Sequence, residues 1–204
     1  MGAGVIPFCV TEGEVRFLFH TTFTGRRAGH LVDFGGGGER GESHRQTAIR
    51  EFIEETETMY FSGNIHAAEL TRERIQAQTP VLEALFNRTL RSHPDWWCQR
   101  RNDSKDKSRD WRTFFIEFEY LDVTDMNREW VLDAGNRFTK QRELLWLPAG
   151  ALSDIFEHSP DRLWKRVRQL VNAKEMIRTI VTSMSEKEKI RQAVLTSSRI
   201  SRDS

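Results

Sequence analysis

Short apolar runs alternate with turn-forming residues near the start of the chain. Residues 5–10 and 15–20 are rich in β-branched and aromatic side chains, and the Glu-Gly pair at 12–13 between them is typical of a tight hairpin. We therefore predict two neighbouring antiparallel strands. A third strand is expected over residues 31–34, directly before four glycines at 35–38, where the backbone must turn sharply or approach another group closely.

From Ser43 onward the spacing of apolar residues becomes helical. Ser43 and Gln46 are three positions apart, as in a capping box, which predicts that a helix begins there. An apolar stripe continues along the following turns. Residues 67–92 also have a mostly helical pattern, but Pro80 interrupts it, and we interpret this region as one or two helices.

The second half of the chain adds further strands and a helical end. Residues 93–112 are polar and are expected to form an exposed loop. Strong β propensity predicts strands over residues 114–121 and 143–148. Beyond Pro160 the apolar residues keep helical spacing, so we expect this part to be helical.

Length and composition favour a single domain. The chain has 204 residues, of which 38% are hydrophobic, which suffices for the core of one domain and favours one domain over two. We predict an α/β (α+β) domain over residues 1–204. It would carry a helical and loop insertion at about 66–111 and C-terminal helices over 160–204.

Charge and cysteine content exclude several classes of protein. The 31 Lys and Arg against 30 Asp and Glu leave a net charge of +1, so no overall field indicates a nucleic-acid or membrane partner. Cys9 and Cys98 are too few for a disulfide framework and are expected to be free thiols. No signal-like start or run of about 18 apolar residues is found. We therefore expect a cytoplasmic protein, with a removed organelle leader left open.

The candidate chemistry lies in residues 36–55. Glu51, Glu54 and Glu55 stand at i, i+3 and i+4, so their carboxylates project from one face of the predicted helix. Like charges placed in this way repel one another without a counterion. A hard divalent cation with oxygen ligands removes the repulsion and also binds phosphate oxygens. The pattern therefore favours a metal site that acts on a phosphorylated substrate.

Residues 36–55 closely resemble the signature of the Nudix hydrolases. That signature consists of Gly, five residues, Glu, seven residues, Arg-Glu, an apolar residue, any residue and Glu-Glu. Its positions are filled here by Gly36, Glu42, Arg50, Glu51, Phe52, Glu54 and Glu55. Chance agreement at the six fixed identities has a probability on the order of 10⁻⁷ to 10⁻⁸ for a given start. The resemblance covers about residues 5–60 and, more weakly, 144–148.

The resemblance implies a fold, a reaction and a set of ligands. The fold would be a Nudix-type α/β/α sandwich with a mixed sheet, and the reaction would be hydrolysis of the diphosphate linkage in a nucleoside diphosphate derivative, with Mg²⁺ or Mn²⁺. The implied metal ligands are the carboxylates of Glu51, Glu54 and Glu55 and the carbonyl oxygen of Gly35 or Gly36. One of these carboxylates would act as general base, and Glu42 and Arg50 would support the ligands.

The end of the signature departs from the family. Two and three positions after the final Glu, the family usually has Gly and an apolar residue, whereas Glu57 and Thr58 are found here. Because that glycine ordinarily ends a helix, we expect a different helix end. Gly63 is a candidate to end the helix later.

A few residues outside the signature are further candidates. Glu143 is the leading candidate for an additional metal ligand, ahead of Glu117 and Glu119, although each also fits an ordinary acid beside a strand. Arg26 and Arg27 precede the third predicted strand and could bind a phosphate or stack on a base of the substrate. An exposed, solubilising loop is the alternative for these two residues.

Aromatic and basic residues mix between positions 96 and 111. Trp96, Trp97 and Trp111 alternate with Arg and Lys, as in a platform for single-stranded nucleic acid. Acidic residues dilute the charge, however, and paired tryptophans usually pack, so we favour a structural role. The alternative function is a regulatory module that binds a nucleotide or RNA on the same fold, using the insertion and this loop.

The signature does not select the substrate. It binds the diphosphate, whereas loops and insertions select the remaining groups. Several substrate classes therefore stay open: nucleoside triphosphates, ADP-ribose or sugar nucleotides, dinucleoside polyphosphates and RNA 5′ ends. The long insertion and the helical C-terminus argue weakly against a minimal nucleoside-triphosphate hydrolase, and they could equally form the interface of a homodimer.

Overall fold

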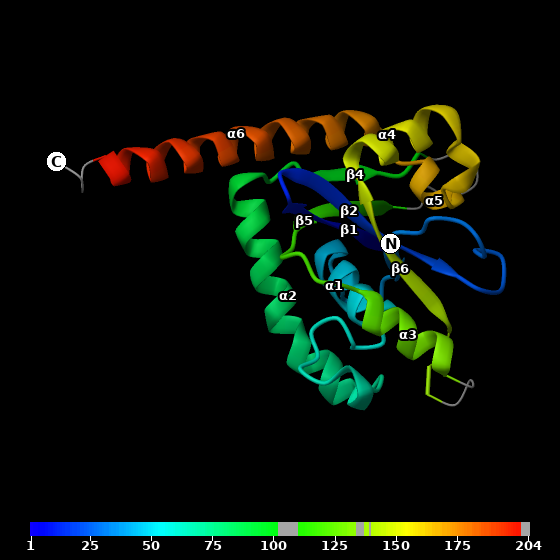
Figure 1. Cartoon of the computed structure of the whole chain (residues 1–204). Coiled ribbons are helices and arrows are strands. Elements are labelled where there is room, and N and C mark those ends of the chain that lie inside the picture. Colours follow the sequence, from blue (N-terminus) through cyan, green and yellow to red (C-terminus); the bar gives the residue numbers. More distant parts are fainter. Residues whose placement is uncertain (102–109, 134–136, 139, 201–204) are drawn as a thin grey trace.

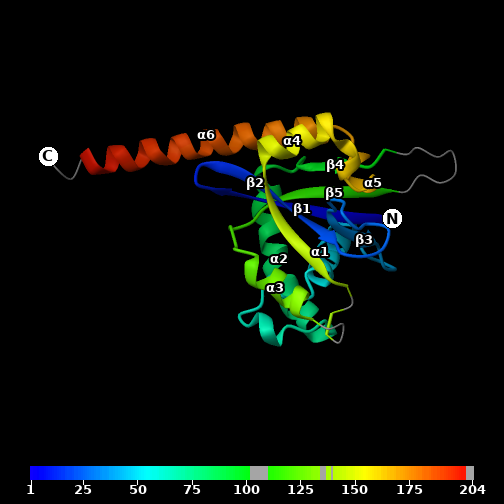
Figure 2. The same ribbon diagram turned by 45° about the vertical axis from the view of Figure 1, so that its right-hand side comes forward.

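The computed structural model describes residues 1–101, 110–133, 137–138 and 140–200. A mixed sheet lies between two layers of helices (Figures 1 and 2). The strands are β1 Gly2–Thr11, β2 Glu14–Thr22, β3 Phe34–Gly37, β4 Trp97–Gln99, β5 Trp111–Glu117 and β6 Arg142–Pro148. The α-helices are α1 His44–Glu55, α2 Arg72–Ser92, α3 Thr124–Leu132, α4 Ala149–His158, α5 Lys165–Arg168 and α6 Ala173–Ile200, and short 3₁₀ helices cover Ile65–Ala67 and Pro160–Arg162. This arrangement confirms the predicted α/β fold class.

The sheet has the order β4-β5-β1-β2-β6, and β3 joins at β1. β1 pairs in parallel with β5, whereas its pairings with β2 and β3 are antiparallel. The same edge of β1 pairs with two strands, with β3 along residues 2–5 and with β2 along residues 8–11. The sheet is therefore mixed, as predicted, and β3 is held at the start of β1.

The first hairpin confirms the sequence prediction. Glu12 and Gly13 both adopt left-handed backbone conformations, with φ of 53° and 77°. Such a turn matches the twist of two antiparallel strands. Both strands extend beyond the predicted ranges.

The third strand differs from its prediction over residues 31–34. Leu31 and Val32 form only isolated bridges, and β3 begins at Phe34 and runs through the glycines to Gly37. The reason is close contact between backbones, because a Cβ on Gly35 would lie 2.4 Å from the carbonyl oxygen of Ala3. The glycines therefore serve a close approach within the sheet, one of the two options that we predicted.

The remaining helices and strands agree only in part with those that the sequence predicts. Residues 72–92 form one continuous helix with Pro80 inside it, and β6 confirms the predicted strand at 143–148. The helices α3 and α4 were not predicted. In α3 only Met126 and Trp130 are buried, which is too thin an apolar stripe to stand out in the sequence.

Two hydrophobic clusters fill the two sides of the sheet. The first packs α1, α2 and α3 against one face, and the second packs α4, α5 and the first part of α6 against the other. Cys9 and Cys98 are buried free thiols, as expected. Within the described residues, no helix combines the length and apolar character that crossing a membrane requires.

Candidate active site

The helix α1 begins where the sequence indicates. Ser43 is its N-cap, the Ser43 side chain accepts a hydrogen bond from the Gln46 amide, and the Gln46 side chain accepts one from the Ser43 amide at 2.9 Å. This confirms the capping box. Ile49 and Phe52 are buried against the sheet. Their burial fixes the rotation of α1 and so determines which way the acidic residues face.

Two residues other than glycine end this helix. Thr56 is the C-cap, and Glu57 and Thr58 follow in the left-handed conformation with φ of 50° and 60°. The Thr58 amide donates to the carbonyl of Ile53 at 2.9 Å. The prediction that Gly63 ends the helix is therefore wrong. A left-handed Glu57 performs the task of the missing glycine at some cost in backbone strain.

Arg50 links the acidic residues of the signature. Its Nε and Nη2 donate to the two carboxylate oxygens of Glu42 at 2.8 and 3.0 Å. Its Nη1 donates to Glu51 at 3.0 Å and to Glu54 at 2.9 Å. Nη2 also donates to the carbonyl of Gly37 at 2.8 Å. One guanidinium group thus connects the loop before α1, β3 and two turns of α1, as the resemblance implied for a supporting residue.

The charges around Arg50 shift the pKa values of these acids in different directions. Hydrogen bonds from Arg50 lower the pKa of Glu42 to about 2. Burial and the nearby charge of Glu55 raise the pKa of Glu51 to about 7, although Arg50 opposes this shift. Burial also raises the pKa of Glu54 against the same opposing charge. Glu51 and Glu54 thus form a partly desolvated acidic pair that one guanidinium does not fully compensate.

Gly36 allows the carboxylate of Glu51 to lie against β3. A Cβ added at Gly36 would be 2.3 Å from a Glu51 carboxylate oxygen, so any larger residue would displace the acid. The predicted close approach of the glycine run therefore has a second role. It brings the backbone of β3 beside the acidic face of α1.

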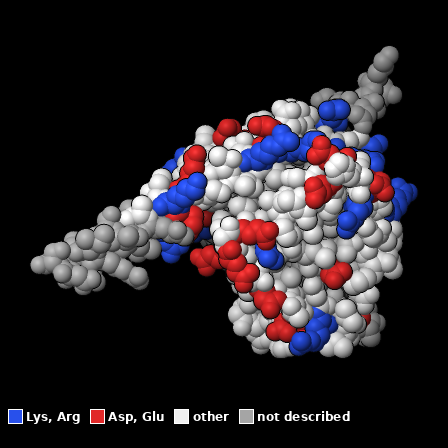
Figure 3. Space-filling view, turned by 45° about the horizontal axis from the view of Figure 1, so that its top comes forward, with Lys and Arg blue, Asp and Glu red and all other residues white. Residues whose placement is uncertain are grey.

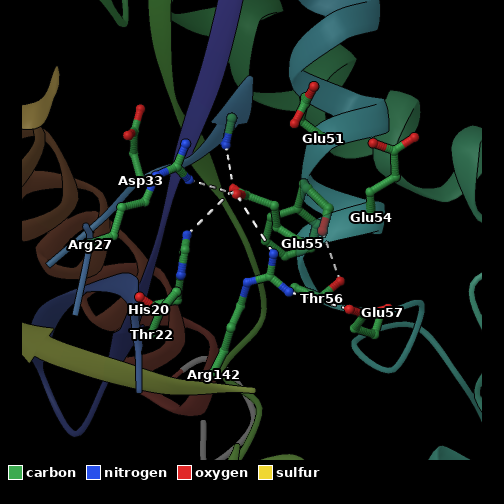
Figure 4. A network of polar contacts seen from close by, with 12 residues as sticks. His20, Thr22, Arg27, Asp33, Glu51, Glu54, Glu55, Thr56, Glu57 and Arg142 are labelled. Atoms are coloured by element: carbon green, nitrogen blue, oxygen red, sulfur yellow. Dashed lines mark hydrogen bonds and ion pairs between the residues drawn. The ribbon is translucent and has the colours of Figure 1, made fainter. Parts of the chain in front are cut away.

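Of the three acids on α1, only Glu55 faces the sheet. Glu51 and Glu54 point in another direction. Figure 4 shows the Glu55 carboxylate directed toward a group of donors, whereas Glu51 and Glu54 project away from that group. The Gly35 amide donates to it at 2.7 Å and Arg27 Nη1 at 3.2 Å. His20 Nε2 lies 3.4 Å and Arg142 Nη2 3.9 Å from the same carboxylate.

These donors keep Glu55 ionised in the interior. Burial by itself would raise its pKa, but His20 and the guanidinium groups of Arg166 and Arg142 outweigh burial and lower the pKa to about 2. Burial lowers the pKa of His20, against the attraction of Glu55. Glu55 therefore anchors α1 to the sheet through β2, β3 and β6.

Part of the predicted ligand set fits a divalent cation. Glu51 and Glu54 converge on a single nitrogen of Arg50, so they already place two hard oxygen donors around one positive centre. Glu55 does not join them in this arrangement. Within the described parts of the chain, no three acidic, His or Cys side chains form a group that could hold a metal ion.

Of the remaining predicted site residues, Arg27 lies in the site, whereas Arg26 and Glu143 do not. Arg27 is brought into the site by its contact with Glu55, whereas Arg26 is exposed to solvent. Glu143 pairs with Thr21 in the sheet. Because side chains alternate along β6, Glu143 shares the sheet face of Leu145, which packs in the cluster under α4. It therefore lies on the face opposite to α1.

His20 and Arg142 were missed by sequence reasoning. His20 lies in β2 at a position that faces α1, directly after the apolar residues 17–19. Arg142 is the first residue of β6 and lies opposite Thr22. A histidine at the end of the apolar run at residues 15–20 is a sequence signal that could have identified a partner for a buried acid. Arg142 gives no such signal, because only the sheet register brings it to Glu55.

The three tryptophans between positions 96 and 111 pack against the rest of the protein. Trp96 and Trp111 are buried in the second cluster, and Trp96 stacks on His93 with ring centroids 3.6 Å apart. Trp97 is half-buried and lies under the guanidinium of Arg112. The basic residues Lys105, Lys107 and Arg109 lie outside the described residues.

Comparisons with known proteins give structural matches only. No family model matches the sequence, and no similar sequence was found among curated proteins. An Ap4A hydrolase of C. elegans has 14% identity, covers 91% of this chain and 97% of its own, and has a TM-score of 0.48. A Nudix hydrolase of M. smegmatis, RenU, has 13% identity, coverage of 90% and 87%, and a TM-score of 0.42.

A third structure is the NUDIX domain of Shewanella oneidensis NrtR complexed with ADP ribose. It has 12% identity, covers 93% of this chain and 86% of its own, and has a TM-score of 0.34. Structures similar to this chain thus include Nudix hydrolases, the family whose signature residues 36–55 resemble. All three TM-scores lie below 0.5, so a function for this chain must rest on its own site.

Proposed function

We propose that this protein hydrolyses the diphosphate linkage of a nucleoside diphosphate derivative and that it requires Mg²⁺ or Mn²⁺. The observation that supports this most is the convergence of Glu51 and Glu54 on one nitrogen of Arg50, which Glu42 holds from its other side. Two partly desolvated carboxylates beside a glycine-rich strand are suited to a divalent cation and to the phosphate oxygens that such a cation binds.

Glu51, Glu54 and the carbonyl oxygen of Gly35 or Gly36 would hold the cation. A bound cation would neutralise the charge of the phosphate groups and polarise the phosphorus that water attacks. Water attacks that phosphorus and forms a new P–O bond, while the bridging P–O bond breaks and the bridging oxygen leaves with the electron pair on the second phosphate product. A carboxylate of the pair accepts the proton of the water. In this proposal Glu42 and Arg50 act as positioning residues, and the role of Glu55 as a third ligand stays a prediction.

The second candidate function is a module that binds a nucleotide or RNA without cleaving it. The engagement of Glu55 by His20, Arg27 and Gly35 favours this candidate, because it removes one implied ligand from the acidic face. The burial of Trp96 and Trp111 argues against a nucleic-acid platform at that place. RNA 5′ ends stay among the possible substrates of the enzyme.

The test is phosphate release from a panel of nucleoside diphosphate derivatives in the presence of Mg²⁺ or Mn²⁺. Glu51→Gln and Glu54→Gln keep the size of each side chain but remove its charge, and we expect each to lower turnover by at least about 100-fold. Glu73→Gln, on the exposed side of α2, is the matched control and should retain full turnover. Glu143→Gln should also retain turnover, because Glu143 lies on the opposite face of the sheet.

Each alternative gives a different result in this experiment. If wild-type protein turns over no member of the panel but binds one of them, the binding module replaces the enzyme. If Glu54→Gln retains full turnover, the proposed metal site is wrong. Loss of turnover in Glu143→Gln would restore that residue as a ligand from outside the signature.

A further inference from the structure

The long helix α6 continues beyond the body of the molecule (Figures 1 and 2). Among the described residues, Met184 is its last buried side chain. The side chains described after it are exposed, except that of Glu188, which is half-buried. The last ion pair described between α6 and the body joins Lys187 to Glu117 at 3.0 Å. From Lys187 to Ile200 a helix spans about 20 Å, so α6 carries exposed side chains away from the body.

A groove lies at the place where α6 leaves the body. It consists of two adjoining hollows of about 310 and 330 Å³, which share Phe118, Glu119 and Tyr120 in their walls. The first hollow is also lined by Met184 of α6, and the second extends to Val81 of α2. The groove thus runs from the root of α6 to α2.

Exposed apolar side chains concentrate at this groove. The large apolar residues with exposed side chains in the described part of the chain are Met1, Val10, Phe23, Val81, Tyr120, Leu121, Val131, Leu132 and Ile190. Four of these nine line the groove, namely Val10, Val81, Tyr120 and Leu121. A fifth, Ile190, lies on α6 where the helix leaves the body. Such a concentration indicates an interaction surface, because exposed apolar residues without a partner are usually scattered singly.

The groove and the helix also carry complementary charges. Glu119 is exposed and lines both hollows, and Lys189 is exposed on α6. Within the described residues neither of them forms an ion pair, whereas the neighbouring Glu117 is paired with Lys187. Figure 3 shows Asp and Glu side chains gathered on the body near the place where α6 leaves it. The groove is therefore suited to a helix that carries a cation such as Lys189.

The end of α6 cannot fill the groove of its own chain. The helix is continuous from Ala173 to Ile200, so its residues after Arg191 lead away from the body. A second copy of the chain presents the same helix without this restriction. In a two-fold dimer each copy would place its helix in the groove of the other, so that one pair of complementary surfaces is used twice.

We propose that this chain forms a homodimer in which residues 186–193 of α6 pack in the groove of the partner. Ile190 contacts the apolar wall around the partner's Tyr120, and Lys189 pairs with the partner's Glu119. The dimer buries apolar side chains that a single copy exposes, and it supports a helix end that would be only marginally stable by itself. This inference goes beyond the proposed function and does not depend on it, because none of these residues lies in the acidic site.

The test is sedimentation equilibrium of the full chain at protein concentrations up to about 100 μM. We expect the wild type to form a reversible dimer with the mass of two chains. Ile190→Asp should weaken the dimer by at least about tenfold, because it places a charge against the apolar wall of the partner's groove. Val131→Asp is the matched control, since Val131 and Ile190 are both helical and both 66% exposed, but Val131 does not line the groove. It should dimerise as wild type does.

An exchange of charges shows whether the contact joins two chains. Glu119→Lys and Lys189→Glu each place like charges opposite one another, so each variant by itself should dimerise at least about tenfold more weakly than wild type. An equimolar mixture of the two variants should form a heterodimer of wild-type stability, because both contacts then join a Lys to a Glu. A contact within one chain would not be restored by mixing.

Three outcomes overturn the inference. The first is a wild type that stays monomeric over the whole concentration range, which would leave the groove to a partner other than this chain. The second is a dimer that Ile190→Asp and both charge variants leave unchanged, which would place the interface elsewhere. The third is a mixture of the charge variants that stays monomeric. Circular dichroism of each variant should show the helix content of wild type, because the changed side chains are exposed.

Discussion

At the scale of single residues, the site depends on how one cation is shared among several acids. Arg50 forms a two-point pair with Glu42 and donates with its remaining nitrogen to Glu51 and Glu54. Glu42 therefore has a fixed partner, whereas Glu51 and Glu54 share theirs. Hydrogen bonds from Arg50 lower the pKa of Glu42, whereas burial raises the pKa values of Glu51 and Glu54 by more than the shared nitrogen lowers them.

The Glu42–Arg50 pair predicts a defined dependence of stability on pH. The pKa of Glu42 is lowered to about 2 in the folded protein from an ordinary value of 4.5. Its contribution to the free energy of unfolding is therefore complete above about pH 4.5 and is lost as the pH falls toward 2. We expect Glu42→Gln to cost up to about 3 kcal/mol at pH 7 and less than half of that at pH 3.

Urea unfolding of wild type and Glu42→Gln at pH 7, 4 and 3 measures this difference. Glu73→Gln serves as the control and should match wild type at each pH. A Glu42→Gln deficit that stays constant between pH 7 and pH 3 would contradict the ion pair as its cause.

At the scale of elements, β3 and α1 together form the acidic site, and their glycines have different tasks. Gly35 is surrounded by backbone, since its Cβ would lie 2.4 Å from the Ala3 carbonyl oxygen and 2.5 Å from the Gly4 Cα. At Gly36, the three atoms nearest to an added Cβ all belong to the carboxylate of Glu51. A side chain at position 35 would clash with backbone and could be accommodated only if the sheet moved. A side chain at position 36 could be accommodated if the Glu51 side chain rotated away.

This contrast predicts opposite consequences for two neighbouring substitutions. Gly35→Ala should destabilise the protein by about 1–3 kcal/mol, because the clash is with backbone. Gly36→Ala should change stability little but lower turnover by at least about tenfold, because Glu51 is displaced. Urea unfolding and turnover of the two variants provide the measurements. Equal loss of stability in both, with full turnover in Gly36→Ala, would show that Glu51 is not held as described.

The sequence predicted the local parts of this site better than its long-range contacts. The capping box at Ser43 and the shared face of Glu51 and Glu54 follow from spacing along one helix. The inward turn of Glu55 does not, because its partners come from three strands. The left-handed conformation of Glu57 was also hidden, since a residue other than glycine is not expected at a position with positive φ.

At the scale of the whole molecule, the sheet carries both cores and places the site at the start of β1. We propose that residues 1–204 form one domain, because the two clusters pack on opposite faces of the same strands. The insertion contributes α2 to one face and β4 to the sheet edge, while the C-terminal part packs α5 and the first part of α6 against the other face. Both regions thus belong to the architecture around the site.

The central claim is that water attacks a diphosphate linkage at the acidic face when a divalent cation is present. The most direct measurement is turnover of the nucleotide panel in ¹⁸O-labelled water, with and without Mg²⁺ or Mn²⁺, followed by mass spectrometry of the phosphate products. We expect one ¹⁸O atom in one of the two products, only in the presence of the cation. Binding of a panel member with no labelled product under either condition would contradict the claim and identify the protein as a binding module.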